Sequence, residues 1–194
     1  MSEPSKQIKA WRPIKAPMGL FLLAIDEQDA LHTDWPDILR RPWPEDSLLD
    51  ESCCPEAATA LEAYFEGESI DPALNRNVKT PSGPPFYARC WQACRTIRMG
   101  GRTTYADLAR LAGSPNAVRA AASSMRQNPL PIFVPCHRII ESGGGLGGFA
   151  GTTEPSSPAL ELKKDLLEFE STFDTSMDLE REVPALAAGG ISCA

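Results

Sequence analysis

The sequence lacks several features that would place it in a large class of proteins. No apolar run approaches the roughly 20 residues of a membrane span, and the opening MSEPSKQIKAWRPIK has no apolar core of a secretion signal. There are only two histidines, and the six cysteines show no paired C-x-x-C spacing. These absences predict a cytoplasmic chain with reduced thiols, no membrane association, no zinc site and no disulfide framework.

Negative charge is nearly absent from residues 86–150, which contain only two acidic residues. The segment also contains no lysine. The same segment has 8 arginines and a net charge of +6, whereas residues 1–85 carry −7 and residues 151–194 carry −6. A basic centre between acidic flanks is typical of a surface that faces phosphates. A solvated arginine face would have the same composition, so charge alone leaves both interpretations open.

Composition and punctuation indicate two domains. The chain has 194 residues, of which 42% are hydrophobic, enough to bury a core in one large or two small domains. The Pro- and Gly-rich stretch TPSGPPF, residues 80–86, reads as a linker. We therefore expect an acidic N-terminal domain at 1–82, a C-terminal domain at 83–172 and a loose tail at 173–194.

The N-terminal part reads as a small sheet with one helix. The apolar stretch Met18–Asp26 predicts a strand, with IKAWRPI and DALHTDW as its partners in an antiparallel sheet. Residues Cys54–Gly67 predict a helix, because Pro55 stands near its start and Gly67 follows its end.

The C-terminal part reads as mostly helical. A first helix is expected over 87–101, ending at the glycines, and a second over 104–113, with Thr104 as its cap. A third helix is expected over 114–128, with Ser114 as N-cap and Pro115 as its first helical residue. The last two, joined at Gly113, form a helix-turn-helix candidate. A loop at 151–159 precedes a final amphipathic helix, LKKDLLEFE. The fold class is therefore α+β.

One stretch, NPLPIFVPCHRIIESGG, sets a cysteine beside a rare histidine. Cys136 is a buried structural thiol, a metal ligand or a nucleophile. Because a thiol with a pKa of about 8.5 is mostly protonated at neutral pH, a nucleophilic cysteine needs a base or cation beside it, and His137 and Arg138 follow directly. The isolated histidines give no metal-binding spacing, which leaves the first and third interpretations.

The run GGGLGG at 143–148 matches G-x-G-x-x-G letter by letter. It lacks the parallel βαβ setting and the downstream acidic residue of a dinucleotide site. We interpret it as a flexible loop whose backbone passes close to a ligand.

The residues from about Phe86 to Glu170 resemble the O6-alkylguanine-DNA alkyltransferases, or methylated-DNA–protein-cysteine methyltransferases. The resemblance rests on Asn-Pro at 128–129, PCHR at 135–138, the glycine-rich loop, and a Tyr-bearing helix followed by an Arg-Ala helix. The strand MGLFLLAI is similar to the second strand of that family's N-terminal domain.

The resemblance implies DNA repair by a single-use transfer of an alkyl group from O6 of guanine to Cys136, with no cofactor. His137 would act as base through a bridging water, and Glu170 would orient it. Asn128 would stabilise the turn that holds the cysteine, and Tyr105 would donate to the guanine and help rotate the phosphate during base flipping.

The resemblance also implies a monomer that binds double-stranded DNA in the minor groove with its helix-turn-helix. The expected DNA-binding residues are Thr104, Arg119, Ala120, Ser123 and Arg126, with Arg119 filling the space of the flipped base. The expected pocket residues are Pro135, Arg138, Phe149, Ala150 and Gly151.

Four positions depart from the family pattern. Phe149 stands in place of a tyrosine, Ala150 in place of a serine and Ala121–Ala122 in place of Val-Gly, and residues 152–159 read as an insertion. Two other functions are alternatives: an alkyltransferase-like module that recognises damage without transfer, whose members lack the cysteine, and a cysteine hydrolase that uses Cys136 and His137. The expected location is the cytoplasm, on the nucleoid in a bacterium, or the nucleus in a eukaryote.

Overall fold

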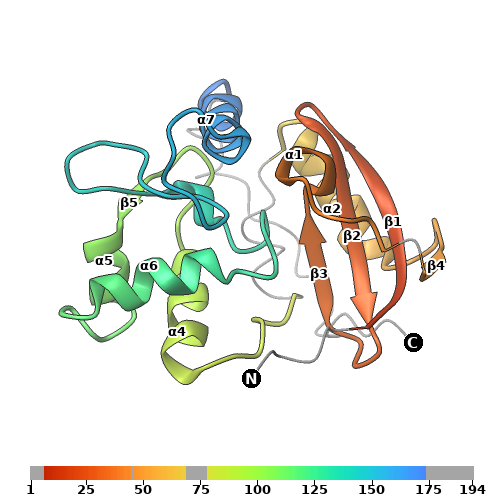
Figure 1. Cartoon of the computed structure of the whole chain (residues 1–194), viewed down its shortest axis with the longest axis horizontal. Helices are drawn as coiled ribbons and strands as arrows, with labels where there is room; N and C mark the ends of the chain where they lie inside the picture. Colours follow the sequence, from red (N-terminus) through yellow and green to blue (C-terminus); the bar gives the residue numbers. More distant parts are fainter. Residues whose placement is uncertain (1–6, 45, 69–77, 174–194) are drawn as a thin grey trace.

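The computed structural model describes residues 7–44, 46–68 and 78–173, in which a four-stranded sheet stands beside a group of helices (Figure 1). The strand order is β3-β2-β1-β4. The antiparallel pairs predicted from the sequence are present: β1 (Ile8–Ala16) with β2 (Gly19–Asp26), and β2 with β3 (Leu31–Asp34). The short β4 (Leu48–Leu49), which the sequence did not predict, adds a parallel pair with β1 and makes the sheet mixed.

The N-terminal sheet and its helices pack through aromatic side chains. The β1–β2 hairpin closes with Ala16 opposite Gly19, whose φ of +126° suits a residue without a side chain. From β2, the Phe21 ring lies 4.3 Å from Trp35, just before α1 (Pro36–Leu39), and 5.5 Å from Phe65 on α2 (Pro55–Phe65). Helix α2 begins at Pro55, as predicted.

The C-terminal part contains α4 (Pro85–Cys94), α5 (Tyr105–Leu111), α6 (Val118–Arg126) and α7 (Pro158–Ser171). Helices α5 and α6 form the predicted helix-turn-helix pair. Two helix ends differ from the prediction. Helix α4 ends at Cys94, well before the glycines, and α6 begins at Val118 instead of directly after Ser114. Residues 114–117 make a turn, closed by Ala117 N–H donating to the Ser114 carbonyl at 2.9 Å, as Ser-Pro-Asn sequences favour.

Two short parallel strands bring distant residues together. Strand β5 (Thr103–Thr104) pairs with β6 (Ile139–Ile140). Tyr105 directly follows β5, and the 3₁₀ turn η1 (Cys136–Arg138) directly precedes β6. This pairing therefore sets the start of α5 beside the cysteine.

The two halves share buried surface. Their buried hydrophobic residues form a single cluster, and the edge strand β3 touches the segment that leads to η1. Thr33 donates its N–H to the Pro129 carbonyl at 3.2 Å and its hydroxyl to the Pro131 carbonyl at 2.8 Å. The division at residue 82 thus remains a prediction about folding units, and the sheet supports the segment that leads to η1 whichever way the chain divides.

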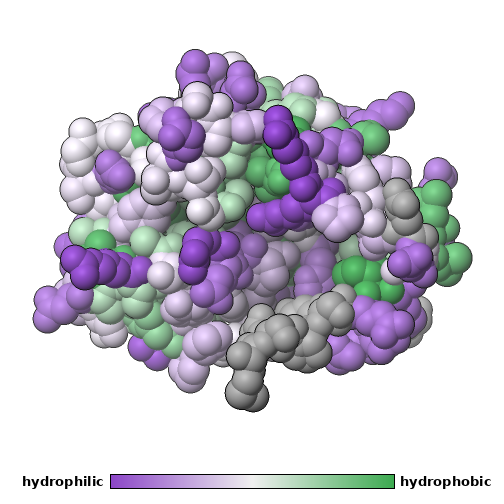
Figure 2. Space-filling view, in the orientation of Figure 1, coloured by the Kyte–Doolittle hydropathy of each residue, from purple (hydrophilic) through white to green (hydrophobic). Residues whose placement is uncertain are grey.

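On the face that Figure 2 shows, hydrophilic and weakly polar residues are mixed with smaller hydrophobic areas, one of them at the edge formed by β4, where Leu48 and Leu49 are exposed. Over the described ranges, no helix has the length and apolar character that crossing a membrane demands. The tail predicted from residue 173 onward lies, apart from Phe173, outside the described residues.

Candidate active site

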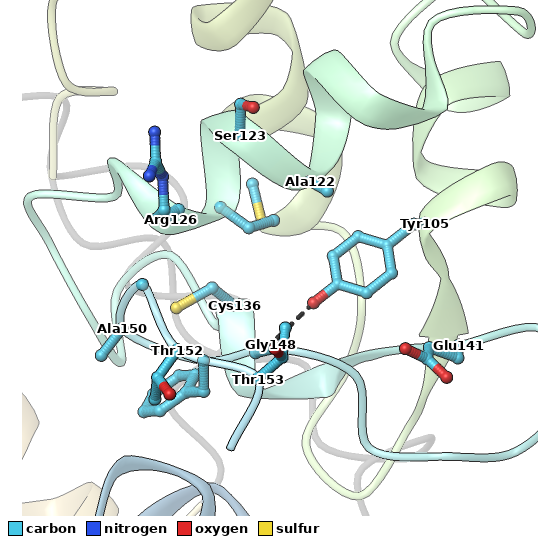
Figure 3. Close-up of a pocket in the computed structure, with 13 residues that line it drawn as sticks. Tyr105, Ala122, Ser123, Arg126, Cys136, Glu141, Gly148, Ala150, Thr152 and Thr153 are labelled. Atoms are coloured by element: carbon cyan, nitrogen blue, oxygen red, sulfur yellow. Dashed lines mark hydrogen bonds between the residues drawn. The ribbon is translucent and has the colours of Figure 1, made fainter. Parts of the chain in front are cut away.

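A cavity of about 320 Å³ opens between α6, the start of α5 and the turn after the glycine-rich loop (Figure 3). The Cys136 sulfur points into this space, below α6 and toward the Ala150 turn. Its lining combines one thiol with mostly small side chains: Tyr105, Ala122, Ser123, Met125, Arg126, Cys136, Glu141, Gly148, Phe149, Ala150, Gly151, Thr152 and Thr153.

Asn128 holds the cysteine in place. Its side-chain N–H donates to the Val134 carbonyl at 2.8 Å and to the Cys136 sulfur at 3.2 Å, while its oxygen accepts from the Leu130 N–H at 3.0 Å. One amide thus spans the loop from residue 128 to η1. The expected role of Asn128 in the turn is compatible with this geometry.

Behind the cysteine lies a buried polar cluster centred on Glu170 from α7. Its Oε1 accepts from His137 Nε2 at 2.8 Å, from Arg138 Nη2 at 2.8 Å and from the Tyr64 hydroxyl at 2.7 Å. Its Oε2 accepts from Arg138 Nε at 3.0 Å and from the Gly100 N–H at 3.1 Å. Glu170 is fully buried, and these donors satisfy its charge.

The cluster sets the protonation state of the histidine. Burial opposes ionisation of Glu170, but His137 and Arg138 outweigh it and hold the pKa of this carboxyl well below its usual range. Burial lowers the pKa of His137, and Arg138 and Lys163 act in the same direction, against the pull of Glu170. At neutral pH the imidazole is therefore neutral.

The carboxylate also assigns the imidazole tautomer. An ionised carboxylate only accepts hydrogen bonds, so His137 Nε2 carries the proton that it donates to Glu170. The lone pair on Nδ1 is then the position able to take up a proton. Burial raises the pKa of the Cys136 thiol, which Asn128 and Lys163 only partly offset. A protonated thiol thus lies next in sequence to a neutral base.

Lys163 on α7 holds the loop that forms one wall of the cavity. Its ammonium donates to the carbonyls of Ile139 and Leu146, both at 2.6 Å, and of Gly148 at 3.2 Å. The same nitrogen lies 5.8 Å from the Tyr105 ring centre. Burial lowers the pKa of Lys163 to about 8, although nearby acidic groups raise it. This lysine ties β6, the glycine-rich loop and α7 together.

We expect Lys163→Met to loosen this wall and to destabilise the protein by about 1–3 kcal/mol, because three carbonyls lose their donor. The pKa of Lys163 in the folded protein, about 8, lies below its ordinary value of 10.5. Between about pH 8 and 10.5 the folded protein therefore holds fewer protons than the unfolded chain, and the stability of the wild type rises with pH relative to that of the variant. Urea unfolding of both proteins at pH 7 and pH 9.5 measures this. A stability difference that does not change with pH would contradict it.

The same wall continues into a tight turn, and α6 lies across the cavity from it. Phe149 and Thr152 exchange backbone hydrogen bonds of 2.9 and 3.0 Å, and Ala150 and Gly151 between them have φ of +47° and +94°. Two positive φ values describe a two-residue hairpin turn that glycine or asparagine usually occupies, so Ala150 is strained there. Tyr105 donates its hydroxyl to the Gly148 carbonyl at 3.0 Å, and burial raises its pKa to about 12.

Not all expected site residues reach the cavity. Pro135 is absent from the cavity lining, and the Arg138 side chain bonds to Glu170 instead of lining the cavity. The Thr104 hydroxyl is occupied as the α5 cap, bonded to Asp107. Of the α6 residues expected to bind DNA, Ser123 and Arg126 line the cavity. Arg119 is exposed and Ala120 half-buried, both outside the lining.

The positive charge of the central segment is partly internal. Arg138 and Arg95 are buried, so they do not contribute an exposed cation. The exposed arginines of the helix-turn-helix are Arg110, Arg119 and Arg126. Among the described residues, no group of three or more side chains could hold a metal ion.

Two polar residues of the site were missed by the sequence reasoning, Lys163 and Tyr64. Lys163 had a detectable signal, because it shares the buried face of α7 with Leu160, Leu167 and Glu170 at helical spacing. A charged residue on an apolar face needs an internal partner. Tyr64 had no such signal, since a tyrosine on the buried face of α2 is ordinary core composition.

Comparisons with known proteins agree with this geometry. Residues 85–172 match the family model described as 6-O-methylguanine DNA methyltransferase, DNA binding domain. The chain is 36% identical over 160 residues to the methylated-DNA–protein-cysteine methyltransferase of Methanosarcina barkeri, covering 81% of this chain and 94% of that protein. It is also 36% identical over 166 residues to the constitutive methylated-DNA–protein-cysteine methyltransferase of Bacillus subtilis, covering 80% and 92%.

Solved structures give the same result. The O6-methylguanine methyltransferase of Mycobacterium tuberculosis superposes with a TM-score of 0.67 at 28% identity, covering 89% of this chain and 98% of that chain. The same organism's protein in complex with DNA gives a TM-score of 0.66 at 29% identity, covering 84% and 93%.

Proposed function

Because the chain belongs to the methylated-DNA–protein-cysteine methyltransferase family, it is a DNA-binding repair protein that reverses alkylation directly, and we propose that Cys136 accepts the alkyl group from O6-alkylguanine. The observation that carries the assignment is the Cys136 sulfur in the cavity, held by Asn128 and backed by the His137–Glu170 pair. A nucleophile, a base and an orienting carboxylate are the parts that thiol activation needs.

The proposed transfer is a single displacement. The Cys136 sulfur attacks the alkyl carbon, a carbon–sulfur bond forms, and the bond from that carbon to guanine O6 breaks. The electron pair of the broken bond stays on the purine, which takes up one proton and becomes guanine. Because the thioether has no leaving group that water can displace, each molecule acts once.

His137 receives the thiol proton. Cys136 and His137 are neighbours on the 3₁₀ turn η1, and a bridging water carries the proton from the thiol to Nδ1. Glu170 stabilises the imidazolium that forms, as the carboxylate does in hydrolase triads. The lowered pKa of His137 keeps this base neutral before the single transfer.

The flipped base occupies the cavity between α6 and the wall formed by the glycine-rich loop and the turn at Phe149–Thr152. Phe149 stacks on the purine without offering the hydroxyl that a tyrosine would. With alanine at position 150, the backbone N–H groups of the turn at 150–151 take over hydrogen bonding to O6. Tyr105, protonated throughout the physiological range, donates to the ring once its bond to Gly148 is exchanged.

Helix α6 docks in the minor groove of double-stranded DNA. Its alanines and serines allow close approach, and Arg119, exposed on this helix, inserts where the guanine leaves the stack. Ser123 and Arg126 lie at the mouth of the cavity, where they contact the flanking backbone. The protein acts as a monomer, in the cytoplasm or wherever its DNA is held.

We expect Arg119→Ala to slow transfer about 10-fold on a matched duplex, because the inserted side chain offsets unstacking that costs a few kcal/mol. The defect should shrink when the damaged guanine faces a mismatched base, which flips more easily. Arg110→Ala is the control, since it removes the same charge from the same helix-turn-helix. Equal defects in both variants would reduce Arg119 to a general phosphate contact.

The function is tested by intact-protein mass spectrometry after incubation with a duplex containing O6-methylguanine. We expect the mass of one methyl group on one equivalent of protein, located on Cys136, and none with an undamaged duplex. Binding to damaged DNA with an unmodified Cys136 would favour the recognition module. Multiple turnovers on an ester or amide would favour the hydrolase.

A further inference from the structure

The N-terminal half supplies one side chain to the cluster behind Cys136. Tyr64, in the last turns of α2, is 1% exposed and donates its hydroxyl to Glu170 Oε1 at 2.7 Å. The two residues are 106 positions apart in the chain. A short bond between buried groups this far apart in sequence depends on how the two halves pack.

The oxygen that accepts from Tyr64 is the one that accepts from His137. Oε1 therefore has His137 Nε2 on one side, the Tyr64 hydroxyl on another and Arg138 Nη2 on a third, all between 2.7 and 2.8 Å. A carboxylate oxygen has about two lone-pair directions, so these three donors share them, and the geometry of each bond depends on the other two. The Tyr64 hydroxyl therefore helps to set the position of Oε1 relative to the His137 ring.

We propose that Tyr64 is a positioning residue for the transfer: its hydroxyl fixes Glu170 Oε1 so that the carboxylate aligns His137 with Cys136. The inference rests on the proposed function, because it assigns Tyr64 a part in activating that thiol. It gives the N-terminal half a chemical task in addition to bracing the fold.

Packing alone does not require the hydroxyl. The Tyr64 ring makes edge contacts with Phe65 at 5.2 Å and with Phe169 of α7 at 5.8 Å. Phenylalanine at position 64 would keep both contacts and remove only the oxygen. Tyr64→Phe therefore separates the hydrogen bond from the packing of α2 against α7.

The direction of the effect follows from the charges around His137. Arg138 on η1 and Lys163 on α7 disfavour its protonated form, and Glu170 favours it. The Tyr64 hydroxyl from α2 shares the negative charge of Oε1. When it is removed, more of that charge acts on His137, so its pKa rises. The less constrained carboxylate also aligns the imidazole less well.

The experiment compares Tyr64→Phe with wild type in single-turnover transfer from a saturating O6-methylguanine duplex across pH 5 to 8.5. We expect a plateau rate about 10-fold lower, as for partners that orient a reacting histidine, and an acidic limb displaced to higher pH. The affinity for DNA should not change. Tyr87→Phe is the matched control, because Tyr87 packs on Trp91 in α4, and it should behave as wild type.

A second readout does not depend on transfer. The chain has only two histidines, so ¹⁵N-imidazole NMR yields two sets of signals, and a His32→Asn variant assigns them. We expect the pKa of His137 to be higher in Tyr64→Phe than in wild type.

The outcomes are distinguishable. Wild-type protein that gains no methyl group would overturn the proposed function and this inference together. Wild type that transfers, with Tyr64→Phe matching its rate, pH profile and His137 titration, would overturn the inference alone. A lower melting temperature with unchanged rate and titration would assign Tyr64 a purely structural role and would also overturn it.

Discussion

Cys136→Ala is expected to abolish alkyl transfer while leaving damaged-DNA binding intact. The variant lacks the only thiol in the cavity lining, and the Met125 thioether and the hydroxyls there cannot form a thiolate that would replace it. The helix-turn-helix and the turn at Phe149–Thr152 do not depend on the thiol, so affinity for the O6-methylguanine duplex should stay within about twofold. Intact mass and fluorescence anisotropy measure the two quantities on the same samples.

The matched control is Cys94→Ala. Cys94 on α4 is fully buried, burial raises its pKa well above the ordinary value, and the charge of Cys136 acts in the same direction. It lies near the site without lining the cavity. This variant should still gain one methyl group, at the cost of some stability from the lost volume. A methyl group on Cys94 in the Cys136→Ala protein would contradict the assignment of the acceptor.

The site residues that could be predicted from the sequence are those that lie within a short local motif. Cys136 and His137 are adjacent, and Asn128 stands in a short motif before them, so local pattern and resemblance together indicate the site. The helix-turn-helix was predicted for the same reason, since Gly113 separates two periodic segments. The predicted start of α6 was wrong. The sequence Ser-Pro-Asn can either cap a helix or form a turn, and in this structure it forms the turn.

The residues that sequence did not reveal act across the fold. Arg138 follows His137, yet its side chain points away from the cavity because a 3₁₀ turn directs successive residues to different sides. Tyr64 meets Glu170 only because α2 packs near α7. The pairing of β4 with β1 likewise depends on a long-range contact, and the two exposed leucines of the very short β4 give no pattern that predicts a strand.

Glu170 joins both halves, so replacing it should produce the largest loss of stability in this site. Glu170→Gln removes the charge that Arg138 faces in a fully buried setting. Leaving a buried guanidinium without its partner costs about 3–5 kcal/mol. The glutamine amide also cannot accept from His137, Tyr64 and Arg138 as the carboxylate does, so transfer should fall about 100-fold. Urea unfolding and single-turnover kinetics measure the two effects.

The matched control lies on the same helix. Glu168 is exposed and pairs with Lys164 at 3.6 Å, so Glu168→Gln should change stability by less than about 0.5 kcal/mol. Unchanged transfer in Glu168→Gln would show that loss of a carboxylate from α7 does not itself slow the reaction.

The pH dependence identifies the charge as the cause. The folded-state pKa of Glu170 lies well below its ordinary value of 4.5, so its contribution is complete above that value and is lost as pH falls. As the pH falls from about 5 to 3, the wild type should therefore lose stability faster than Glu170→Gln. The difference between their free energies of unfolding should become smaller. A gap that stays constant over this range would mean that lost packing, rather than the buried ion pair, destabilises the variant. In that case Glu170 would position His137 through shape alone, and Tyr64→Phe should leave the pKa of His137 unchanged.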